Sequence, residues 1–321
     1  MKVLVTGGAG FIGSNVADGF IAQGHQVVVV DNLTTGYSRN IPEKAAFYQV
    51  DIREAGLEEV FRKERPDVVD HHAAQIDVRK SVEDPMYDAR VNVLGSLNVI
   101  QQCLRYQVKK LIYASTGGAV YGEPEFLPAD ERHPVRPLCQ YGVTKHTVEH
   151  YLHLYREHYG LDYTVLRYPN VYGPRQDPLG EAGVVAIFTE ALMHGRRPTI
   201  FGDGTHTRDY VFVGDIVGAN ILALQRGSGM ILNLGWGREV SVNDIFNTLK
   251  EHLSSDVEPI YEAERLGEIH RICLDNSRAG ETLDWKPEVS LKKGIERTVQ
   301  YYREHPAHLS DERPGDPIER D

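Results

Sequence analysis

The sequence contains few of the features that mark secreted, membrane-embedded or nucleic-acid-binding proteins. The 321 residues include only 3 cysteines, Cys103, Cys139 and Cys273. Their odd number and wide spacing fit neither a disulfide framework nor a metal-binding motif. No apolar run approaches the ~20 residues that span a bilayer. The formal net charge of -11 argues against nonspecific binding to nucleic acid or to an anionic membrane surface. We therefore expect a cytoplasmic protein with reduced thiols and with neither a nucleic acid nor a membrane as its partner.

The first two-thirds of the chain alternate short apolar runs with amphipathic stretches. A hydrophobic content of 41% and a charged content of 25% are ordinary for a globular protein, and the alternation is typical of βαβ units. The expected strands are Lys2–Thr6, Val27–Asp31, Ala46–Val50, Val68–His71, Lys110–Ala114 and Tyr163–Arg167. The pattern predicts an α/β fold with a Rossmann-type, doubly wound parallel sheet.

A second, smaller unit is indicated by a change of pattern after Tyr168. Pro169 and Gly173-Pro174 mark loops, and the elements that follow are short and mixed. A lobe of this kind would bind a substrate beside the larger domain. The expected parts are a Rossmann domain (1–169 with about 208–229), a mixed α/β lobe (about 170–207 and 230–303) and a flexible, proline-rich tail (304–321).

A glycine-rich turn follows the first expected strand directly. The run from Gly7 to Gly13 places glycines in a G-x-x-G-x-x-G pattern between a strand and a helix. Gly7 permits a tight turn, Gly10 lets the backbone approach a pyrophosphate, and Gly13 allows the helix to pack closely on the strand. The N–H groups at the start of the helix, at Phe11 and Ile12, would then face the phosphates. The turn predicts a dinucleotide site, with a plain tight turn as the alternative interpretation.

A carboxylate, Asp31, ends the second expected strand about 20 residues beyond the glycine-rich turn. It can accept hydrogen bonds from the adenosine ribose hydroxyls, and its charge would repel a 2′-phosphate, so it selects NAD over NADP. The alternative is that Asp31 only forms a turn at the end of its strand. Asp51-Ile52 follows the third expected strand, where the adenine would lie.

Two adjacent histidines, His71 and His72, end the fourth expected strand and precede Ala73-Ala74. Such a pair raises the question of a metal site. Neighbouring residues of a strand point to opposite faces of the sheet, however, and no third ligand stands near the pair in the sequence. We therefore expect no metal site.

Tyr141 and Lys145 lie one helical turn apart and would share a helix face. The ammonium group and the positive ring of NAD⁺ both favour phenolate, so they would lower the pKa of the tyrosine from ~10 toward neutrality. A phenolate can take the proton of an alcohol while hydride leaves the same carbon. The alternative is a surface helix pair without a chemical role, since chance matches to Tyr-x-x-x-Lys are expected among 17 tyrosines.

Together these segments resemble the extended short-chain dehydrogenase/reductase family over nearly the whole chain. Two of the matching segments, Arg167–Pro174 and Phe201–Tyr210, are quite specific to the nucleotide-sugar enzymes of that family. The resemblance therefore implies an enzyme that uses NAD on a nucleotide-activated sugar. The segments that carry the resemblance are Gly7–Gly13, Asp31-Asn32, Asp51-Ile52, Ala73-Ala74, Asn92, Ser115–Gly122, Tyr141 with Lys145, Arg167–Pro174 and Phe201–Tyr210.

The segment Ser115–Gly122 indicates which reaction of the family to expect. Relatives that dehydrate or decarboxylate their sugar carry an acidic residue beside the active-site Ser or Thr, whereas this sequence has no carboxylate there before Glu123. In this respect the chain looks like a UDP-glucose (UDP-galactose) 4-epimerase. Epimerisation requires only oxidation at C4, rotation of the 4-keto sugar and return of hydride to its other face.

One position departs from the family pattern. Counting back from Val120-Tyr121-Gly122, Gly117 stands where the family has its catalytic Ser or Thr. Three routes for the proton stay open. Thr116, with Ser115 beside it, could reach the sugar O4, a water could relay the proton, or Tyr141 could act directly.

The resemblance also implies which residues hold the two ligands. Arg208 and Arg265 would bind the diphosphate through paired hydrogen bonds; the alternative of a merely exposed arginine applies more to Arg265. Asn170 would bind the diphosphate or the sugar through its side chain. Phe201 would meet the uracil, with a place in the hydrophobic core as the alternative. The implied cofactor residues are Gly7, Gly10, Phe11, Ile12, Gly13, Asp31, Asn32, Asp51, Ile52, His72, Ala73, Ala74, Gln75, Asn92, Ser115, Tyr141, Lys145 and Tyr168. The implied substrate residues are Thr116, Gly117, Tyr141, Asn170, Val184, Phe201, Arg208 and Arg265.

The expected activity is NAD-dependent epimerisation at C4 of a UDP-hexose, UDP-galactose or UDP-glucose, with Tyr141 as the base. A UDP-glucuronate 4-epimerase or another nucleotide-sugar epimerase is the alternative, and the medium-sized Ile272 leaves room for an N-acetyl sugar. A non-catalytic NAD sensor is the alternative of a different class, which Gly117 leaves open. By the same resemblance, two long helices at about Val91–Tyr106 and Tyr141–Tyr159 would form the interface of a homodimer.

We predict that Asp31 sets the choice of cofactor. The protein should bind NAD far more tightly than NADP, because the carboxylate accepts from the ribose hydroxyls of NAD and repels the additional phosphate of NADP. Titration of the purified protein with each dinucleotide measures the two affinities. Equal affinities would contradict the role given to Asp31.

Overall fold

A computed structural model describes residues 1–178, 183–264 and 269–309, and these residues contain one large parallel sheet of seven strands. The strand order, β11-β6-β5-β4-β1-β2-β3, places β1 at the point where the direction of winding reverses. All neighbouring strands in this sheet run parallel, so the prediction of a doubly wound α/β fold is confirmed. The strands are β1 (Lys2–Thr6), β2 (Gln26–Asp31), β3 (Ala46–Gln49), β4 (Val68–His71), β5 (Lys110–Thr116), β6 (Asp162–Tyr168) and β11 (Met230–Asn233).

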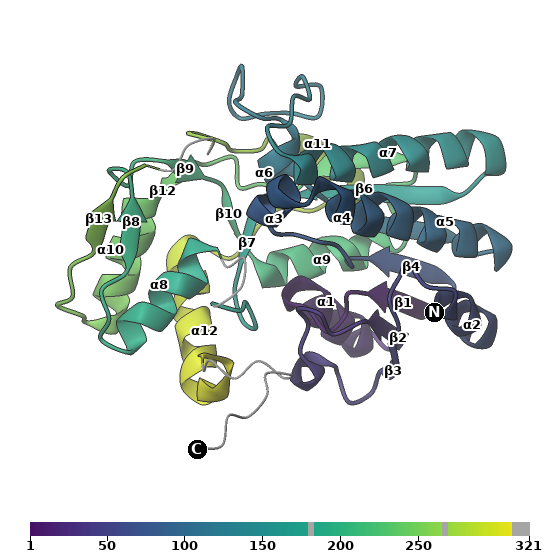
Figure 1. The fold of residues 1–321 in the computed structure, drawn as a ribbon, viewed down its shortest axis with the longest axis horizontal. Helices are drawn as coiled ribbons and strands as arrows, with labels where there is room; N and C mark the ends of the chain where they lie inside the picture. The colour runs from purple at the N-terminus through teal and green to yellow at the C-terminus, as the bar shows by residue number, and fades with distance from the viewer. Residues whose placement is uncertain (179–182, 265–268, 310–321) are drawn as a thin grey trace.

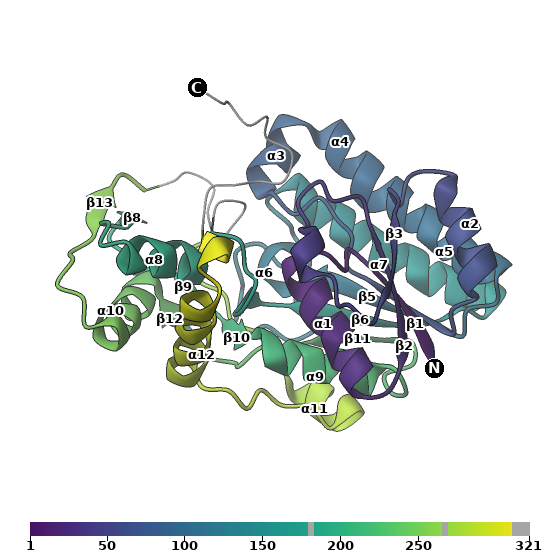
Figure 2. The same cartoon turned by 90° about the horizontal axis from the view of Figure 1, so that it is seen from below.

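Helices cover both faces of this sheet (Figures 1 and 2). One hydrophobic layer packs against α1 (Phe11–Ala22), α9 (Val213–Ala223) and α11 (Ser277–Leu283). The opposite layer packs against α2 (Gly56–Glu64), α5 (Ser96–Arg105) and α7 (Gln140–Tyr159). Ahead of α5 the chain forms α3 (Val78–Glu83), α4 (Pro85–Ala89) and a π-helical segment (Arg90–Gly95).

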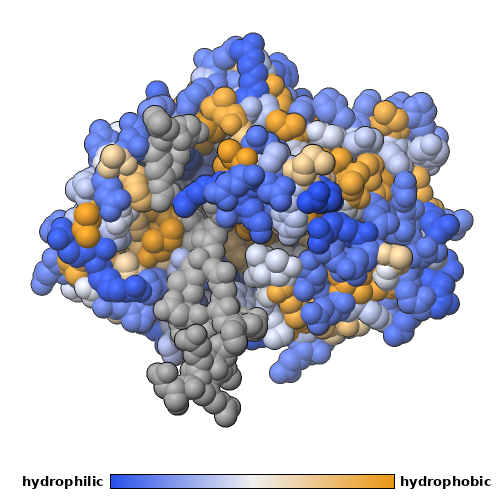
Figure 3. Space-filling view, viewed as in Figure 1, coloured by the Kyte–Doolittle hydropathy of each residue, from blue (hydrophilic) through white to orange (hydrophobic). Residues whose placement is uncertain are grey.

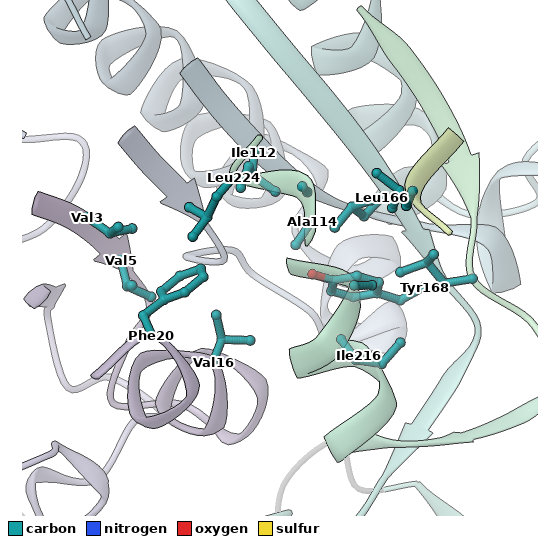
Figure 4. Packing of buried hydrophobic residues seen from close by; sticks show 14 of the residues in the cluster. Val3, Val5, Val16, Phe20, Ile112, Ala114, Leu166, Tyr168, Ile216 and Leu224 are labelled. Carbon is teal, nitrogen blue, oxygen red and sulfur yellow. The ribbon is translucent and has the colours of Figure 1, made fainter. Parts of the chain in front are cut away.

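Alternation along the strands fills the two layers. In β1, Val3 and Val5 belong to the layer under α1, whereas Leu4 lies between them and belongs to the opposite layer. Figure 4 shows Phe20 of α1 and Ile216 of α9 converging on the side chains of the strands. Because both faces are buried at the centre of the sheet, β1, β2 and β5 carry apolar runs, as parallel strands usually do, whereas the edge strand β3 is largely exposed. None of the described helices is both long and apolar enough to cross a membrane.

A smaller lobe lies beside the carboxyl edge of the sheet and has a hydrophobic core of its own (Figure 1). Its short strands form three two-stranded pairs rather than one sheet among the described residues. The pairs are β7 (Asn170–Tyr172) with β10 (Tyr210–Phe212), β8 (Thr199–Phe201) with β13 (Ile260–Glu262), and β9 (Thr207–Arg208) with β12 (Val240–Ser241). The lobe helices are α8 (Val184–Met193), α10 (Val242–Leu253) and α12 (Leu291–Glu304).

The structure corrects where the chain returns to the main sheet. The sequence predicts that residues from about 230 to 303 belong to the lobe, whereas β11 pairs in parallel with β6 and α11 packs on the same face as α1. Conversely, β10 pairs with β7 and not with the main sheet. β11 has only four residues and follows the turn glycines Gly227 and Gly229. Its sequence pattern therefore does not assign it to either unit, and its pairing with β6 determines that it belongs to the main sheet.

The predicted tail begins with an ordered turn. α12 ends at Glu304, and a 3₁₀ turn, Pro306–Leu309, follows it. The Tyr301 hydroxyl lies 3.0 Å from His308 Nδ1, which ties this turn to α12. Residues 310–321 lie outside the described part of the chain, so the flexible tail stays a prediction there.

Candidate active site at the carboxyl edge of the sheet

The turn between β1 and α1 is shaped for an anionic ligand. Gly7 has a φ of +69°, and a Cβ atom there would lie 2.6 Å from the backbone N of Ala73. A Cβ atom on Gly13 would lie 2.3 Å from the carbonyl O of Gly7, so both positions require glycine. Within the described residues, no side chain caps the N-terminus of α1 at Gly10 and no acidic residue stands in its first turn. Free N–H groups and the positive end of the helix dipole therefore fit the diphosphate of a dinucleotide.

Asp31 lies at the end of β2, beside this turn, and is buried. Its carboxylate accepts hydrogen bonds from the backbone N–H groups of Ala9 (3.0 Å) and Leu33 (2.8 Å). Burial raises its pKa, and the two N–H groups act in the opposite direction. Asp31 therefore does form a turn, as the alternative interpretation expected. Its two oxygens keep lone pairs that can also accept from ribose hydroxyls.

Asp51, expected near the adenine, is engaged by neighbouring side chains. The Arg53 guanidinium makes two hydrogen bonds to it, of 2.8 and 2.6 Å, and Asn32 Nδ2 donates a third of 2.9 Å. The hydrogen bond from Arg53 is the main reason that the pKa of Asp51 falls to about 2. Asp51 is therefore a fixed negative group at this corner of the sheet, beside the buried side chain of Ile52.

His71, the last residue of β4, and His72, which follows it, have separate environments, as the sequence predicts for opposite faces. His71 Nδ1 lies 2.6 Å from Thr6 Oγ1 and its Nε2 lies 2.9 Å from Ser96 Oγ, so neither ring nitrogen is left for a metal. Burial lowers the pKa of His71 well below its usual value. His72 instead stacks on Tyr168 with ring centroids 6.1 Å apart, and its Nε2 is 3.0 Å from Asp70 Oδ1.

A buried polar network fixes the loop after β4; it joins the predicted residues Gln75 and Asn92 to Asp88 and Thr144, which the sequence did not single out. Asn92 accepts a hydrogen bond from the backbone N of Gln75 (2.8 Å) and donates one to the carbonyl O of the same residue (3.0 Å). Asp88 accepts from Asn92 Nδ2 (3.0 Å) and from Thr144 Oγ1 (2.8 Å), which joins the loop to α7. Burial raises the pKa of Asp88. The i, i+4 spacing of Asp88 and Asn92 was the available sequence signal.

Tyr141 and Lys145 occupy the first two turns of α7, facing the end of β5. Lys145 is buried and donates to the carbonyl O of Ala114 at 2.8 Å, with its Nζ 6.0 Å from the centroid of the Tyr141 ring. Burial lowers the pKa of Lys145 to about 8 and raises that of Tyr141 above its usual value. Burial alone therefore favours the neutral phenol, and a base role for Tyr141 requires a ligand that brings positive charge beside it.

Ser115 and Thr116, the last residues of β5, have different surroundings. The Ser115 hydroxyl donates to Glu149 Oε1 at 2.6 Å, and Glu149 forms a buried ion pair with Arg167 of β6 (2.5 Å). Thr116 Oγ1 and Asn170 Oδ1 lie 3.9 and 3.7 Å from the point where a Cβ atom on Gly118 would stand. The structure therefore gathers Thr116 and Asn170 at one place and turns Ser115 toward α7.

The structure supplies a reason for glycine at position 117. A Cβ atom there would lie 2.3 Å from Leu274 Cδ1. Leu274 is completely buried in a cluster with Val120 and Ile272, so it has little freedom to move aside. The family resemblance implies a Ser or Thr at position 117. In this chain the space that such a side chain would occupy is filled by a leucine from a distant part of the sequence.

The remaining expected substrate residues come from the lobe. Val184 begins α8, Phe201 ends β8, and Arg208 lies in β9, where its Nη1 donates to the carbonyl O of Thr207 at 2.9 Å. Arg265 lies outside the described residues. The lobe segments thus stand across the carboxyl edge of the sheet from α7, where an open α/β sheet binds its ligands.

Seven parallel strands, a glycine cradle at the switch point and a Tyr–Lys pair at the carboxyl edge define a doubly wound protein of the short-chain dehydrogenase/reductase type. The model of the family described as "NAD dependent epimerase/dehydratase family" matches residues 3–235. The chain belongs to this family.

Individual relatives are similar along almost their full length. The UDP-glucose 4-epimerase of Mycolicibacterium smegmatis is 44% identical over 309 residues, which cover 94% of this chain and 99% of that protein. A structure of UDP-glucose 4-epimerase from Thermotoga maritima with UDP-glucose superposes with a TM-score of 0.94 at 48% identity, covering 95% of this chain and 100% of that one. The UDP-glucose 4-epimerase of Thermus thermophilus, in complex with NAD, gives a TM-score of 0.90 at 44% identity, with coverages of 94% and 99%.

We predict that Gly117→Ser lowers the stability of the protein, because its Cβ atom would overlap Leu274. Overpacking of this kind typically costs about 1–3 kcal/mol. Thermal unfolding should show a lower Tm for Gly117→Ser and a partial recovery in the double variant Gly117→Ser/Leu274→Ala. Gly118→Ser is the matched control, since the nearest atom to its Cβ position is 3.7 Å away. An equal Tm for the two serine variants would show that Leu274 does not restrict this position.

Proposed function

We propose that this protein catalyses NAD-dependent epimerisation at C4 of a UDP-hexose, interconverting UDP-galactose and UDP-glucose. The observation that carries the proposal is the Tyr141–Lys145 pair beside a β5–α6 turn that offers hydroxyls and glycines but no carboxylate (α6 is Gly117–Val120). Three relatives that align over nearly their whole length are UDP-glucose 4-epimerases, which supports this choice of reaction.

The cofactor would be held by the turn before α1, by Asp31 and by the loop after β4. When bound there, NAD would supply hydride transfer from and back to C4 of the sugar. Tyr141 takes the proton from the O4 hydroxyl as that hydride leaves. Lys145 contributes an ammonium group that favours the phenolate form of Tyr141. In the second half of the reaction, after the 4-keto sugar has rotated in the site, Tyr141 returns its proton to O4.

Thr116 is the candidate for relaying this proton, since Gly117 has no hydroxyl. Its Oγ1 and Asn170 Oδ1 both lie within 4 Å of the position of a Cβ atom on Gly118, at the edge where the sugar would lie. Ser115 is a weaker candidate, because its hydroxyl already donates to Glu149. Direct transfer to Tyr141 and transfer through a water remain the competing routes.

The lobe would bind the nucleotide. Arg208 would pair with the diphosphate, and Asn170 would hydrogen-bond the diphosphate or the sugar. Phe201 would stack on the uracil, and Val184 would line the same site. Arg265 keeps its predicted role at the diphosphate.

Two other functions remain as alternatives. The first is epimerisation of another nucleotide sugar, a UDP-glucuronate or a UDP-N-acetylhexosamine. Ile272 is buried in the cluster with Leu274, so neighbouring side chains would determine which of these sugars the site accepts. A non-catalytic NAD sensor would bind the dinucleotide and turn over none of them. Incubation with UDP-galactose, UDP-glucuronate and UDP-N-acetylglucosamine separately, with NMR identification of the products, distinguishes these functions.

We predict that Tyr141→Phe lowers turnover of UDP-galactose by ~10²–10⁴-fold, because the variant keeps the ring but loses the proton acceptor. The affinity for the UDP-sugar should be almost unchanged, and isothermal titration calorimetry measures it separately from the rate. Near-normal epimerisation by Tyr141→Phe would refute the assignment of the base.

The companion variant Thr116→Val tests the proton route. A loss as large as that of Tyr141→Phe would place Thr116 in the proton path, because valine matches the shape of threonine without its hydroxyl. A small loss would favour direct transfer by Tyr141 or relay by a water. Ser115→Ala serves as the neighbouring-hydroxyl control in the same assay.

We further propose a homodimer built on the helices about Val91–Tyr106 and Tyr141–Tyr159. Figure 3 shows hydrophobic patches that interrupt the hydrophilic surface on the side of α3–α5 and α7. Large apolar side chains there are exposed, with exposed fractions of 65% for Met86, 59% for Leu94 and 47% for Leu154.

A cytoplasmic location also remains a prediction, made from the unpaired cysteines.

Light scattering tests the assembly and should give a mass near twice the 36.1 kDa of one chain. Replacing Leu154 with glutamate should move the mass toward that of one chain, because a charge would be buried in the apolar interface. Tyr261→Glu, at an exposed position of the lobe, is the control that should leave the mass unchanged. A monomeric wild-type protein would refute the proposal.

A further inference from the structure

Three side chains of the lobe that the proposed function does not use converge on one point. Ligand atoms of His206, Glu264 and His270 all lie within 4.8 Å of one another. His206 Nε2 is 2.9 Å from Glu264 Oε1, and His270 Nδ1 is 3.7 Å from the same oxygen. We propose that this cluster is a binding site for a divalent transition-metal ion, with Zn²⁺ as the best match. Two imidazoles and one carboxylate are a ligand set of Zn²⁺, which leaves a fourth position for water.

Backbone pairing brings the three ligands together before any ion binds. β8 and β13 run parallel, and the N–H of Gly202 donates to the carbonyl O of Glu262 at 2.9 Å, two residues before Glu264. The N–H of Thr207, next to His206, donates to the carbonyl O of His270 at 3.0 Å. Figure 1 shows β8, β9 and β13 in the same part of the lobe. The ion would therefore need only side-chain adjustment.

The charges around the cluster favour a cation. Glu264 has the two histidines as its ion-pair partners among the described residues. Arg271, the neighbour of His270, donates two hydrogen bonds to Glu239 at 2.8 and 2.6 Å and so does not compete for Glu264. Imidazole nitrogens favour Zn²⁺, Ni²⁺ or Cu²⁺ over Mg²⁺ and Ca²⁺, which prefer oxygen ligands.

The cluster is open to solvent, so an ion can enter. The exposed side-chain fractions are 14% for His206, 50% for Glu264 and 63% for His270. The competing interpretation is that protonated histidines simply pair with Glu264 and that no metal binds. A metal ion would bind His206, Glu264 and His270 at the same time. A proton on one imidazole strengthens only the contact between that imidazole and Glu264.

A second histidine pair provides the matched control. His146 and His150 on α7 have their Nε2 atoms 3.0 Å apart, but the third group near them, Glu149, is held by Arg167. Two histidines one helical turn apart can themselves bind metal weakly. The variant His150→Gln therefore shows how much metal binding belongs to α7 rather than to the lobe.

The test uses the full chain without an affinity tag, stripped with a chelator and titrated with Zn²⁺ by calorimetry and with Co²⁺ by visible absorption. We expect saturable binding of one Zn²⁺ per chain and a rise of Tm with the ion, because binding to the folded state stabilises it. His206→Gln and His270→Gln each remove a direct ligand and should weaken the affinity by more than the roughly 10–100-fold that loss of a hydrogen-bond partner of a ligand costs, and His150→Gln should leave it unchanged.

The exposed position of His270 makes its variant informative even if His206→Gln folds poorly. Circular dichroism of the metal-free variants separates a folding defect from a loss of a ligand. The proposal is overturned if the wild-type protein shows no saturable binding, or if binding survives in His270→Gln but disappears in His150→Gln. Neither outcome bears on the proposed epimerase activity, which is measured with the sugar nucleotides.

Discussion

The buried ion pair between Glu149 of α7 and Arg167 of β6 holds the candidate site together. Two hydrogen bonds join the groups, at 3.0 and 2.5 Å, and the Ser115 hydroxyl and the Tyr121 hydroxyl bond to the same pair. Burial acts to raise the pKa of Glu149, but the hydrogen bonds from Arg167, His146 and Ser115 and the charge of Arg167 together outweigh it and lower the pKa to about 2. Removing one partner of such a pair leaves a buried charge and typically costs about 3–5 kcal/mol. Helix α7 is thereby fixed against β5 and β6, with Lys145 one turn before Glu149.

A second set of buried polar groups fixes the opposite side of the same helix. Thr144 donates to Asp88, and Asn92 joins Asp88 to the loop after β4. Lys145 therefore stands between two anchored points, and its remaining freedom is taken by the hydrogen bond to Ala114 O. Preorganisation of this kind lets a site place charge beside a reacting group without rearrangement at the moment of reaction. The networks are thus the structural basis on which the proposed roles of Tyr141 and Lys145 depend.

The contact of Gly117 with Leu274 shows how a residue far along the chain can limit which side chain a position in the site accepts. Leu274 approaches from the segment after the lobe, where its backbone N–H donates to Asp209. Burial raises the pKa of Asp209 to about 6, while three backbone N–H groups act against that rise. The carboxylate thus connects the start of β10 with the loop after β11 and with Leu274. This connection fills the space beside Gly117 with an apolar side chain, and it moves the question of proton relay to Thr116.

Local spacing along the chain determined the doubly wound fold, the glycine turn, Asp31 and the Tyr141–Lys145 pair. Each of these depends on residues a few positions apart or on a strand and the turn that follows it, and such patterns are set by the periods of helices and strands. Contacts between distant segments were decided only by the tertiary structure. The placement of β11 beside β6, the Leu274 side chain against Gly117 and the meeting of His206 with Glu264 and His270 have no local signature. They arise because strand pairing and core packing bring together residues whose separation along the chain carries no information about their separation in space.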